Sequence, residues 1–267
     1  MKPLWLLGRD VATSPAPRLH NAALTALGQA PRYQVRVVLP ADLDAVLDEA
    51  ERSTAGINVA APYQVRAAER FASVLDDAAG ASGAVDTVVF DDARPVRAAN
   101  TDVVGLLTAW RRASVDVRDR VVAVVGAGGA ARAVVVAARE AGARAVAVHA
   151  RRPEAAALLE ARARALGLDV VDEGAHLVVL AVGALDDAGA TIKRALRGPG
   201  AVHALSVGTA ARTSRDAALR AGCVFLDGTS MLLARAQVAL GLFLGGTPPA
   251  QASAAMSAAV SSWRTWT

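Results

Sequence analysis

Short runs of apolar, often β-branched residues alternate with stretches of helical period along the first hundred residues. Four runs, LWLLG, YQVRVV, AGINVA and AVDTVVF, are bounded by Gly, Pro or Asp, which is typical of strands. Stretches such as RLHNAALTALG and ADLDAVLDEAERS indicate helices between them. Strands that alternate with helices predict an α/β layer with a parallel sheet.

A second series of runs begins near residue 120 and repeats this alternation. Strands are expected at RVVAVV, RAVAVHA, AHLVVLAVG, AVHALSVG and CVFLDG, with Ala- and Arg-rich helical stretches between them. This order predicts a doubly wound, Rossmann-type nucleotide-binding fold. Beyond it, SMLLARAQVALGLFLGG and AQASAAMSAAVSSW predict two final helices, with a corner at GGTPPAQ.

Composition narrows the classes of function. The 267 residues are 54% hydrophobic, enough to bury the core of one large domain or two modest ones. Arginines are spread along the chain and aromatic residues make up 4%, so no nucleic-acid-binding surface is expected. The apolar runs fall short of the roughly 20 residues of a membrane span, and the N-terminus lacks a signal peptide's apolar core. We therefore expect a cytoplasmic protein that binds a small molecule, as a monomer or a homodimer.

The single cysteine, Cys223, excludes an intramolecular disulfide. Because no cluster of His and Cys at ligand spacing accompanies it, a structural zinc site is not expected either. We predict no bound metal.

The strand that ends near residue 125 runs directly into a glycine-rich loop. The loop reads Gly126-Ala127-Gly128-Gly129-Ala130-Ala131, and a helical pattern starts at once. Gly126 allows a tight turn, Gly128 lets the backbone approach a pyrophosphate, and Ala131 keeps helix and strand close. The free N–H groups of the helix N-terminus favour the anion. A dinucleotide site is predicted here.

The strand after this helix ends in Ala150-Arg151-Arg152, with no carboxylate before Glu154. A carboxylate at this point would bind the ribose 2′-hydroxyl of NAD, whereas two guanidiniums suit a 2′-phosphate. The sequence therefore favours NADP(H) over NAD(H). The alternative is that the arginines only cover a solvated face.

Several segments together resemble the shikimate dehydrogenase family over nearly the whole chain. SPAPRLHN (14–21) is similar to that family's Ser-x-Ser-Pro-x-x-His-Asn, GINVAAPYQ (56–64) to Gly-x-Asn-Val-Thr-x-Pro-x-Lys, and GAVDT (83–87) to Gly-Ala-x-Asn-Thr. NTDVVG (100–105) matches Asn-Thr-Asp-x-x-Gly, and DGTSMLLARA (227–236) resembles Asp-Gly-x-x-Met-Leu-x-x-Gln-Ala. The resemblance implies a substrate-binding domain of residues 1–100, completed by C-terminal helices at 232–267, and an NADP-binding Rossmann domain at 101–231.

The resemblance also implies where substrate and cofactor bind, and where this chain departs from the family. The implied substrate-binding residues are Ser14, Asn58, Ala60, Asp86, Asp102 and Arg235, and the implied catalytic residues are Asp102, Gln64 and Asp86. The family has threonine at position 60, the catalytic lysine at 64, asparagine at 86, glutamine at 235, and a second serine where this chain has Ala16. Beside the cofactor, Leu180-Ala181-Val182 replaces Asn-Ala-Thr.

These changes concentrate at substrate contacts, while the residues that make the fold are kept. We therefore expect an NADP-dependent oxidoreductase with an altered substrate, such as an imine or an amino-substituted cyclic acid. Two alternatives stay open. One is a non-catalytic protein that binds NADP or a metabolite, and the other is a lyase or isomerase that uses the carboxylates of Asp86 and Asp102 without redox chemistry.

Overall fold

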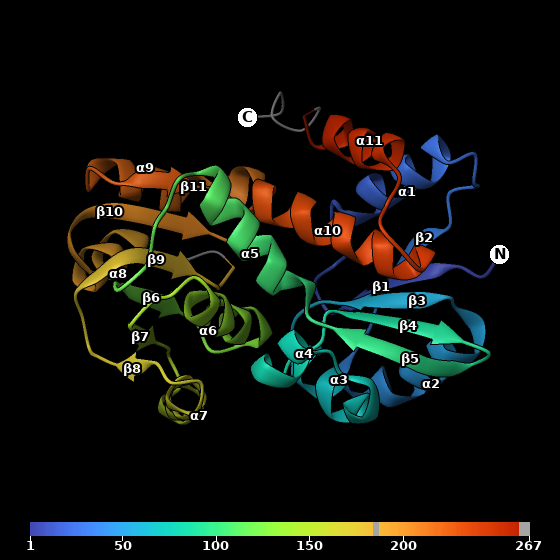
Figure 1. The fold of residues 1–267 in the computed structure, drawn as a ribbon, viewed down its shortest axis with the longest axis horizontal. Coiled ribbons are helices and arrows are strands. Elements are labelled where there is room, and N and C mark those ends of the chain that lie inside the picture. The colour runs from blue at the N-terminus through green and yellow to red at the C-terminus, as the bar shows by residue number, and fades with distance from the viewer. Residues whose placement is uncertain (184–186, 262–267) are drawn as a thin grey trace. The chain divides into compact units, whose positions relative to one another are not determined.

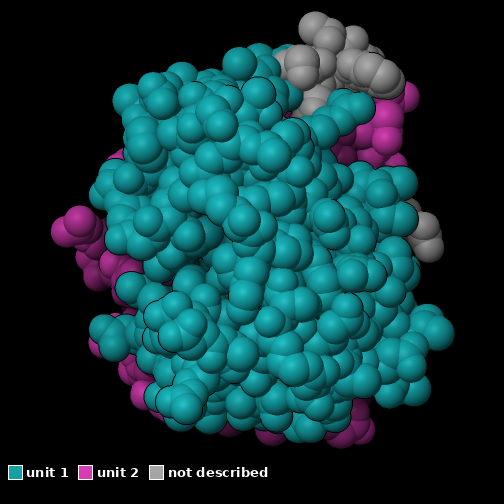
Figure 2. All heavy atoms as spheres, turned by 90° about the vertical axis from the view of Figure 1, so that its right-hand side faces the viewer, with its two compact units in different colours: residues 1–101, 233–265 teal, residues 102–232, 266–267 magenta. Residues whose placement is uncertain are grey.

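The computed structural model describes residues 1–183 and 187–261, which form two compact units. One unit contains Met1–Thr101 and the segment that begins at Leu233, and the other runs from Asp102 to Leu232. Figure 1 shows a separate sheet in each unit, and Figure 2 colours the first unit teal and the second magenta. Residues 262–267, the end of the expected substrate domain and of its last helix, lie outside the described residues.

The first unit is built on a five-stranded sheet in the order β2-β1-β3-β4-β5. Its strands are β1 (Leu4–Gly8), β2 (Tyr33–Val37), β3 (Gly56–Val59), β4 (Thr87–Asp91) and β5 (Arg94–Ala99). Side chains alternate between the two faces of a strand, so Leu4 and Leu6 of β1 enter one apolar cluster and Trp5 and Leu7 another. The apolar run LWLLG is explained by this burial on both faces.

Two features of this sheet differ from the sequence-based expectation. β1, β2 and β3 are parallel, but β4 is antiparallel to both β3 and β5, so the expectation of a fully parallel layer was wrong. Periodicity indicates a strand without giving its direction. The hairpin between β4 and β5 was not predicted. Its turn, Asp92–Ala93, has positive φ at both residues but contains no glycine, so the usual sequence signal of such a turn is missing.

The helices of the first unit lie between the strands and at its C-terminal segment. They are α1 (Ala16–Ala26), α2 (Leu43–Ser53), α3 (Gln64–Arg70), α4 (Asp77–Ser82) and α11 (Ala250–Ser261), with single 3₁₀ turns at Pro40–Asp42 and Ala72–Val74. The helix α10 (Thr229–Leu244) contains the boundary between the units. α1 packs on α11, and α2 packs on β3 and β5.

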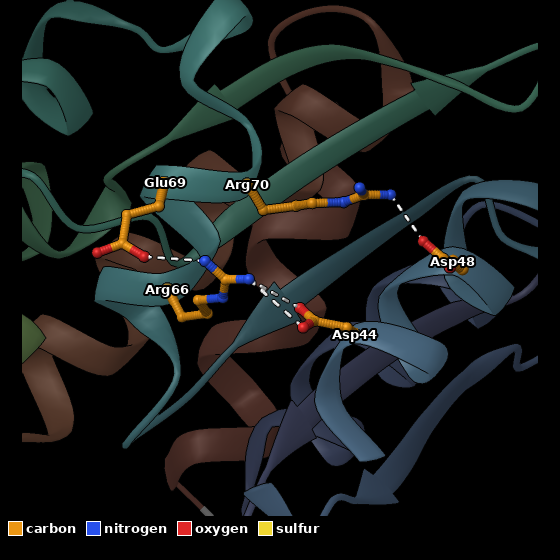
Figure 3. A network of polar contacts seen from close by, with 5 residues as sticks. All are labelled: Asp44, Asp48, Arg66, Glu69 and Arg70. Carbon is orange, nitrogen blue, oxygen red and sulfur yellow. Dashed lines mark hydrogen bonds and ion pairs between the residues drawn. The ribbon is translucent and has the colours of Figure 1, made fainter. Parts of the chain in front are cut away.

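Helices α2 and α3 are joined at the surface by ion pairs (Figure 3). Arg66 lies between Asp44 and Glu69, at N–O distances of 3.4 and 3.2 Å, and Arg70 reaches Asp48 at 2.7 Å. Arg70 also pairs with Glu51 at 2.8 Å. Because most of these side chains are exposed, each pair stabilises the fold only slightly.

The second unit has a six-stranded parallel sheet in the order β11-β10-β9-β6-β7-β8. Its strands are β6 (Val121–Val125), β7 (Ala145–His149), β8 (Asp169–Val170), β9 (Ala175–Leu180), β10 (Leu196–Ala204) and β11 (Val224–Leu226). The chain starts in the middle at β6, proceeds to one edge and returns to fill the other. This is the doubly wound order, so the predicted Rossmann-type fold is confirmed.

Helices connect the strands of this sheet. They are α5 (Thr101–Arg112), α6 (Gly129–Glu140), α7 (Pro153–Ala165), α8 (Ala188–Ala195) and α9 (Arg212–Arg220), and a 3₁₀ turn spans Gly208–Ala211. Ile192 of α8 and Ala217 of α9 pack with Val202 of β10 in one apolar cluster. The neighbouring His203 points away from that cluster and accepts a hydrogen bond at Nδ1 from Trp110 of α5, at 3.1 Å.

Candidate active site and cofactor loop

A buried polar network surrounds Asp86, just before β4. The Asp86 carboxylate oxygen Oδ1 accepts hydrogen bonds from the hydroxyls of Thr87, at 2.6 Å, and Thr101, at 2.8 Å. Asn58 of β3 donates from Nδ2 to the Asp86 carbonyl at 3.1 Å and to the Thr87 hydroxyl at 2.8 Å, and the Tyr33 hydroxyl donates to Asn58 Oδ1 at 2.7 Å. The pairing of Asn58 with Thr87 across β3 and β4 brings these groups together.

Asp86 is fully buried, and the network determines what its carboxylate can do. Two hydroxyls that donate to one oxygen require that oxygen to be an acceptor. Hydrogen bonds to a charged acceptor are stronger than neutral ones, so Thr87 and Thr101 favour the carboxylate form. An asparagine here would carry no charge. The structure thus places a fully buried carboxyl group at this position, with Oδ1 as the hydrogen-bond acceptor of both hydroxyls.

A cation and two neutral aromatic rings accompany this network. His20 of α1 stacks on Tyr33, with ring centroids 4.2 Å apart and an interplanar angle of 3°. Burial, with a smaller contribution from the charge of Arg235, lowers the pKa of His20 to about 3. Burial raises the pKa of Tyr33, an effect that Arg235 opposes and Asp86 reinforces. Both rings are therefore neutral near pH 7, and Arg235 lies close enough to act on each.

The remaining residues of the expected substrate site lie on the segments around this network. The Ser14 hydroxyl accepts a hydrogen bond from Ala16 N at 3.3 Å, at the start of α1. Ala60 follows β3, and its N–H donates to Leu7 O. Gln64 is the first residue of α3, 6% exposed, and its carbonyl accepts the N–H of Val85 at 2.8 Å, next to Asp86.

Asp102 is the second residue of α5 and is buried. A carboxylate in the first turn of a helix is favoured by the helix dipole. It follows Thr101, which donates to Asp86. Within the first unit, Asn58 and Asp86 are joined by a direct hydrogen bond from the Asn58 side chain to the Asp86 carbonyl.

The cofactor loop follows β6 at the carboxyl edge of the parallel sheet. Gly126 has φ of +119°, and a Cβ atom there would lie 2.7 Å from Ala181 O and 3.1 Å from Val182 Cγ1. Only glycine fits this turn. Gly128 is exposed and precedes the first residue of α6, and a Cβ atom there would meet nothing within 4 Å. The space above Gly128 leaves the backbone open to a ligand.

The other expected cofactor residues flank this loop. Gly129 begins α6, Ala127 and Ala130 are half-buried, and Val182 packs against the apolar cluster beneath the sheet. Arg151 and Arg152 follow the end of β7, and Arg152 is the residue immediately before α7, without a side-chain hydrogen bond to the helix. Both arginines are exposed. Exposed arginine side chains at the end of the second strand suit recognition of a phosphate.

Tyr33 and Thr101 are the network members that sequence reasoning missed. Thr101 lies within the Asn-Thr-Asp motif, and the motif alone gives no sign that its hydroxyl bonds to Asp86. Tyr33 gave no signal because its partner Asn58 lies 25 residues away in the sequence. Outside this network, Tyr63 is buried and its hydroxyl donates to Val38 O at 2.6 Å.

Metal clusters and membrane-spanning helices are both absent from the described part of the chain. Within residues 1–183 and 187–261, no group of three or more His, Cys, Asp or Glu side chains is arranged to hold a metal ion. The helices described there are all too short or too polar to cross a membrane.

Comparison with known proteins gives matches in both sequence and structure. The family model of the shikimate dehydrogenase substrate binding domain matches residues 6–88. The NADP(+) shikimate dehydrogenase of Rubrobacter xylanophilus is 41% identical over 133 residues, which is 49% of this chain and 46% of that protein. That of Methanothrix thermoacetophila is 39% identical over 137 residues, 50% of this chain and 49% of that protein. The matches thus span about half the length of these relatives.

Solved structures match over almost the entire chain. The shikimate 5-dehydrogenase of Thermus thermophilus in complex with shikimate has a TM-score of 0.81 and 30% identity, covering 98% of this chain and 100% of that one. The same enzyme in complex with NADP(H) and shikimate has a TM-score of 0.78 and 29% identity, covering 97% of this chain and 100% of that one. Mycobacterium tuberculosis shikimate dehydrogenase gives 0.81 and 27%, covering 98% of this chain and 100% of that one.

Proposed function

Because this chain belongs to the shikimate dehydrogenase family, we propose that it is an NADP-dependent oxidoreductase that acts on a substrate other than shikimate. The main observation that supports this proposal is the buried carboxylate of Asp86, which accepts hydrogen bonds from two threonine hydroxyls. Relatives of this chain bind NADP(H) and shikimate. The cofactor loop follows their pattern, and the changes lie in the other unit.

Three features support NADP(H) as the cofactor. Gly128 has open space above its backbone, α6 presents its N-terminus at the same point, and Arg151 and Arg152 are exposed beyond β7. The arginines supply donors for a 2′-phosphate, which NADH lacks. The substrate domain of residues 1–100 and 232–267 and the cofactor domain of residues 101–231 follow from the same proposal.

Calorimetric titration tests the cofactor. We expect NADPH to bind much more tightly than NADH, and Arg151→Ala/Arg152→Ala to weaken NADPH binding by roughly tenfold to a hundredfold. Arg220→Ala, at the exposed end of α9, is the matched control and should leave the affinity unchanged. A preference for NADH, or equal NADPH affinity in the double variant, would show that the cofactor assignment is wrong.

The substrate is argued from proton chemistry. Reduction of a ketone by hydride gives an alkoxide, which needs a proton donor. The relatives' lysine fills that role, and Gln64 cannot, since a glutamine does not titrate near neutral pH. When hydride from NADPH instead adds to the carbon of an iminium, the C=N π pair becomes the nitrogen lone pair. The products are a neutral amine and NADP⁺, and no proton donor is needed.

The charges of the first unit fit such a substrate. The carboxylate of Asp86 favours a positively charged nitrogen or a hydrogen-bond donor, where asparagine would accept either kind of group. Arg235, whose charge reaches His20 and Tyr33, supplies a cation for the acidic group that Ala16 no longer holds. We therefore assign the substrate class as a cyclic imine or an amino-substituted cyclic acid.

An assay that follows NADPH, which is consumed when substrate is reduced and formed when substrate is oxidised, tests the substrate class. Cyclic imines such as 1-piperideine-2-carboxylate, and amino-substituted cyclohexene carboxylic acids run in the oxidative direction, are compared in the parent, Asp86→Asn and Gln64→Lys proteins. We expect turnover in the parent that falls at least tenfold in Asp86→Asn. Activity unchanged by Asp86→Asn, or activity that appears only with a ketone after Gln64→Lys, would refute the nitrogen-bearing substrate.

Gln64 itself favours a second candidate function. With no titratable group at that position, the chain can bind NADP or a metabolite without turnover. NADPH binding by calorimetry together with no consumption for any carbonyl or imine probe would select this non-catalytic function.

A further inference from the structure

The amide of Asn58 is almost fully used inside the protein. Its side chain is 3% exposed, and its Nδ2 group makes two hydrogen bonds, to Asp86 O and Thr87 Oγ1. An amide nitrogen carries two hydrogens, so no donor remains for a ligand. Its oxygen accepts the Tyr33 hydroxyl at 2.7 Å.

The hydrogen bonds from Tyr33 through Asn58 and Thr87 to Asp86 all have their donors on the side of Tyr33 and their acceptors on the side of Asp86. The Thr87 oxygen receives a hydrogen from Asn58, so the single hydroxyl hydrogen of Thr87 is the one donated to Asp86. The Tyr33 hydroxyl donates to Asn58, and the same order therefore runs from Tyr33 through Asn58 and Thr87 to the carboxylate. Donors aligned in series toward a charge polarise and strengthen one another.

We propose that Tyr33, Asn58, Thr87 and Thr101 form a positioning network that holds the Asp86 carboxylate as an acceptor toward the substrate, and that Asn58 does not itself contact substrate. This inference rests on the proposed function for its consequence, selection of a nitrogen-bearing ligand. It assigns Asn58 a role different from the substrate contact that family resemblance implies. Turning the amide toward a ligand would leave the Tyr33 and Thr87 hydroxyls without these partners in a buried site, which is unfavourable.

Conservative variants separate the network from ordinary packing. Tyr33→Phe removes one hydroxyl and keeps the ring that stacks on His20. Thr101→Val removes the hydroxyl with little change of shape, and Thr101→Ser restores it. Tyr63→Phe is the matched control, because Tyr63 is also buried in the first unit and donates to a backbone oxygen outside the network.

The first measurement needs no substrate. In the unliganded protein, exchange of the Asn58 side-chain amide hydrogens with solvent is followed by NMR. We expect exchange to accelerate at least tenfold in Tyr33→Phe and to stay at the parent rate in Tyr63→Phe. Equal exchange in parent and Tyr33→Phe would overturn the network.

The second measurement is a double-mutant cycle on ligand selectivity. The probes are an amino-substituted cyclohexene carboxylic acid and shikimate, its hydroxyl counterpart, with dissociation constants measured by calorimetry in the presence of NADP⁺. We expect Tyr33→Phe and Thr101→Val to lower the preference for the amino probe about threefold to tenfold, Thr101→Ser to retain it, and both effects to vanish in the Asp86→Asn background. Asparagine keeps an oxygen for the threonine hydroxyls, removes the charge and replaces the other carboxylate oxygen with an NH2 donor.

The outcomes distinguish this inference from the proposed function. If the amino probe binds but is not oxidised by NADP⁺, the oxidoreductase proposal is refuted. The double-mutant cycle then still tests whether the network positions Asp86. If neither probe binds, amide exchange decides it alone. Loss of selectivity in Tyr33→Phe that persists in the Asp86→Asn background would contradict positioning through Asp86. A shift of the Asn58 amide signals on ligand binding that is equally large in Asp86→Asn would indicate direct contact by Asn58.

Discussion

The glycine loop of the second unit and the Asp86 network of the first are built from different parts of the chain, and we propose that each recognises its ligand accordingly. At the loop, the requirement is steric: Gly126 fits a turn that a Cβ atom would block, and backbone N–H groups face the ligand. Around Asp86, hydroxyl, amide and carboxylate side chains form the hydrogen bonds that join Asn58, Thr87 and Thr101 to the carboxylate.

This difference explains where the chain departs from its family. Backbone recognition survives most side-chain substitutions, so a phosphate site keeps its chemistry as long as the glycines are kept. A side-chain network changes its chemistry with one substitution, and an aspartate in place of asparagine adds a charge at position 86. The molecule thus combines a cofactor loop of the family pattern with a substrate network of different charge.

The largest expected effect is on shikimate itself. Loss of a proton donor typically lowers a rate by about 10² to 10⁴, and each buried hydroxyl lost at Ala16 and Ala60 leaves a substrate group unpaired at about 1–3 kcal/mol. Shikimate-dependent NADP⁺ reduction should be at background, and Gln64→Lys alone should recover only a small part of it. A parent rate typical of the relatives would show that the network does not select against shikimate.

Next in size is the contrast between two glycines of the loop. Gly126→Ala should lower the free energy of unfolding by about 2–4 kcal/mol, because the residue adopts φ of +119° and its Cβ would approach Ala181 O. Gly128→Ala should change stability by less than about 1 kcal/mol, since its φ is negative and the space is open. Chemical denaturation measures both.

The Gly128→Ala variant also tests cofactor binding separately from folding stability. Gly128→Ala should weaken NADPH binding measured by calorimetry, because the added methyl group occupies the space through which the phosphates approach. Unchanged NADPH affinity in Gly128→Ala would mean that the cofactor does not bind at this loop, and the contrast between a backbone site and a side-chain site would no longer hold.

A third prediction uses one buried histidine in each unit. Burial lowers the pKa of His20 to about 3 and that of His203 to about 4, the latter against an opposing effect of Asp227. The unfolded state therefore binds these protons first. Above pH 6.5 the two histidines have little effect on the free energy of unfolding. As the pH falls from 6.5 toward the folded-state pKa, each lowers this free energy, by about 2 kcal/mol at pH 5.

Urea denaturation between pH 5 and 8 checks this prediction. His20→Phe keeps a ring against Tyr33 and removes the titrating group, so it should flatten the pH dependence. The same slope in parent and variant would mean that His20 is not neutral in the folded protein. Protonation of His203 at Nδ1 would also break its hydrogen bond from Trp110.

Most of the fold was predictable from the sequence, and the exceptions have physical causes. Runs buried on both faces, such as β1 and β6, gave strong signals, and the doubly wound order followed from their alternation with helices. The two-residue strand β8 and the edge strand β5, which contains Pro95 and exposed arginines, have no apolar run to detect. Strand direction in the β3–β4–β5 part depends on long-range pairing, which periodicity does not encode.

The candidate site was predictable in part. Local motifs located Gly126, Gly128 and the arginine pair, because a phosphate loop is contiguous in sequence. The resemblance located Asp86 and Asn58. The hydrogen bonds that join them to Tyr33 and Thr101 connect residues 25 and 15 positions apart. No local sequence pattern indicates such contacts. The two hydrogen bonds that occupy the Asn58 amide could therefore be identified only from the structure.

The smallest expected effect concerns the surface ion pairs between α2 and α3, on the helix that begins with Gln64 (Figure 3). Arg70→Ala, Asp48→Ala and the double variant should give a coupling of about 0.2–1 kcal/mol in a double-mutant cycle of unfolding free energy, because both side chains are largely exposed. This coupling should shrink further in 1 M salt. NADPH affinity and ligand selectivity should match the parent, in contrast to Tyr33→Phe. If Arg70→Ala changed selectivity as much as Tyr33→Phe does, the orientation of α3 would control the site, and the buried network would not be its distinguishing feature.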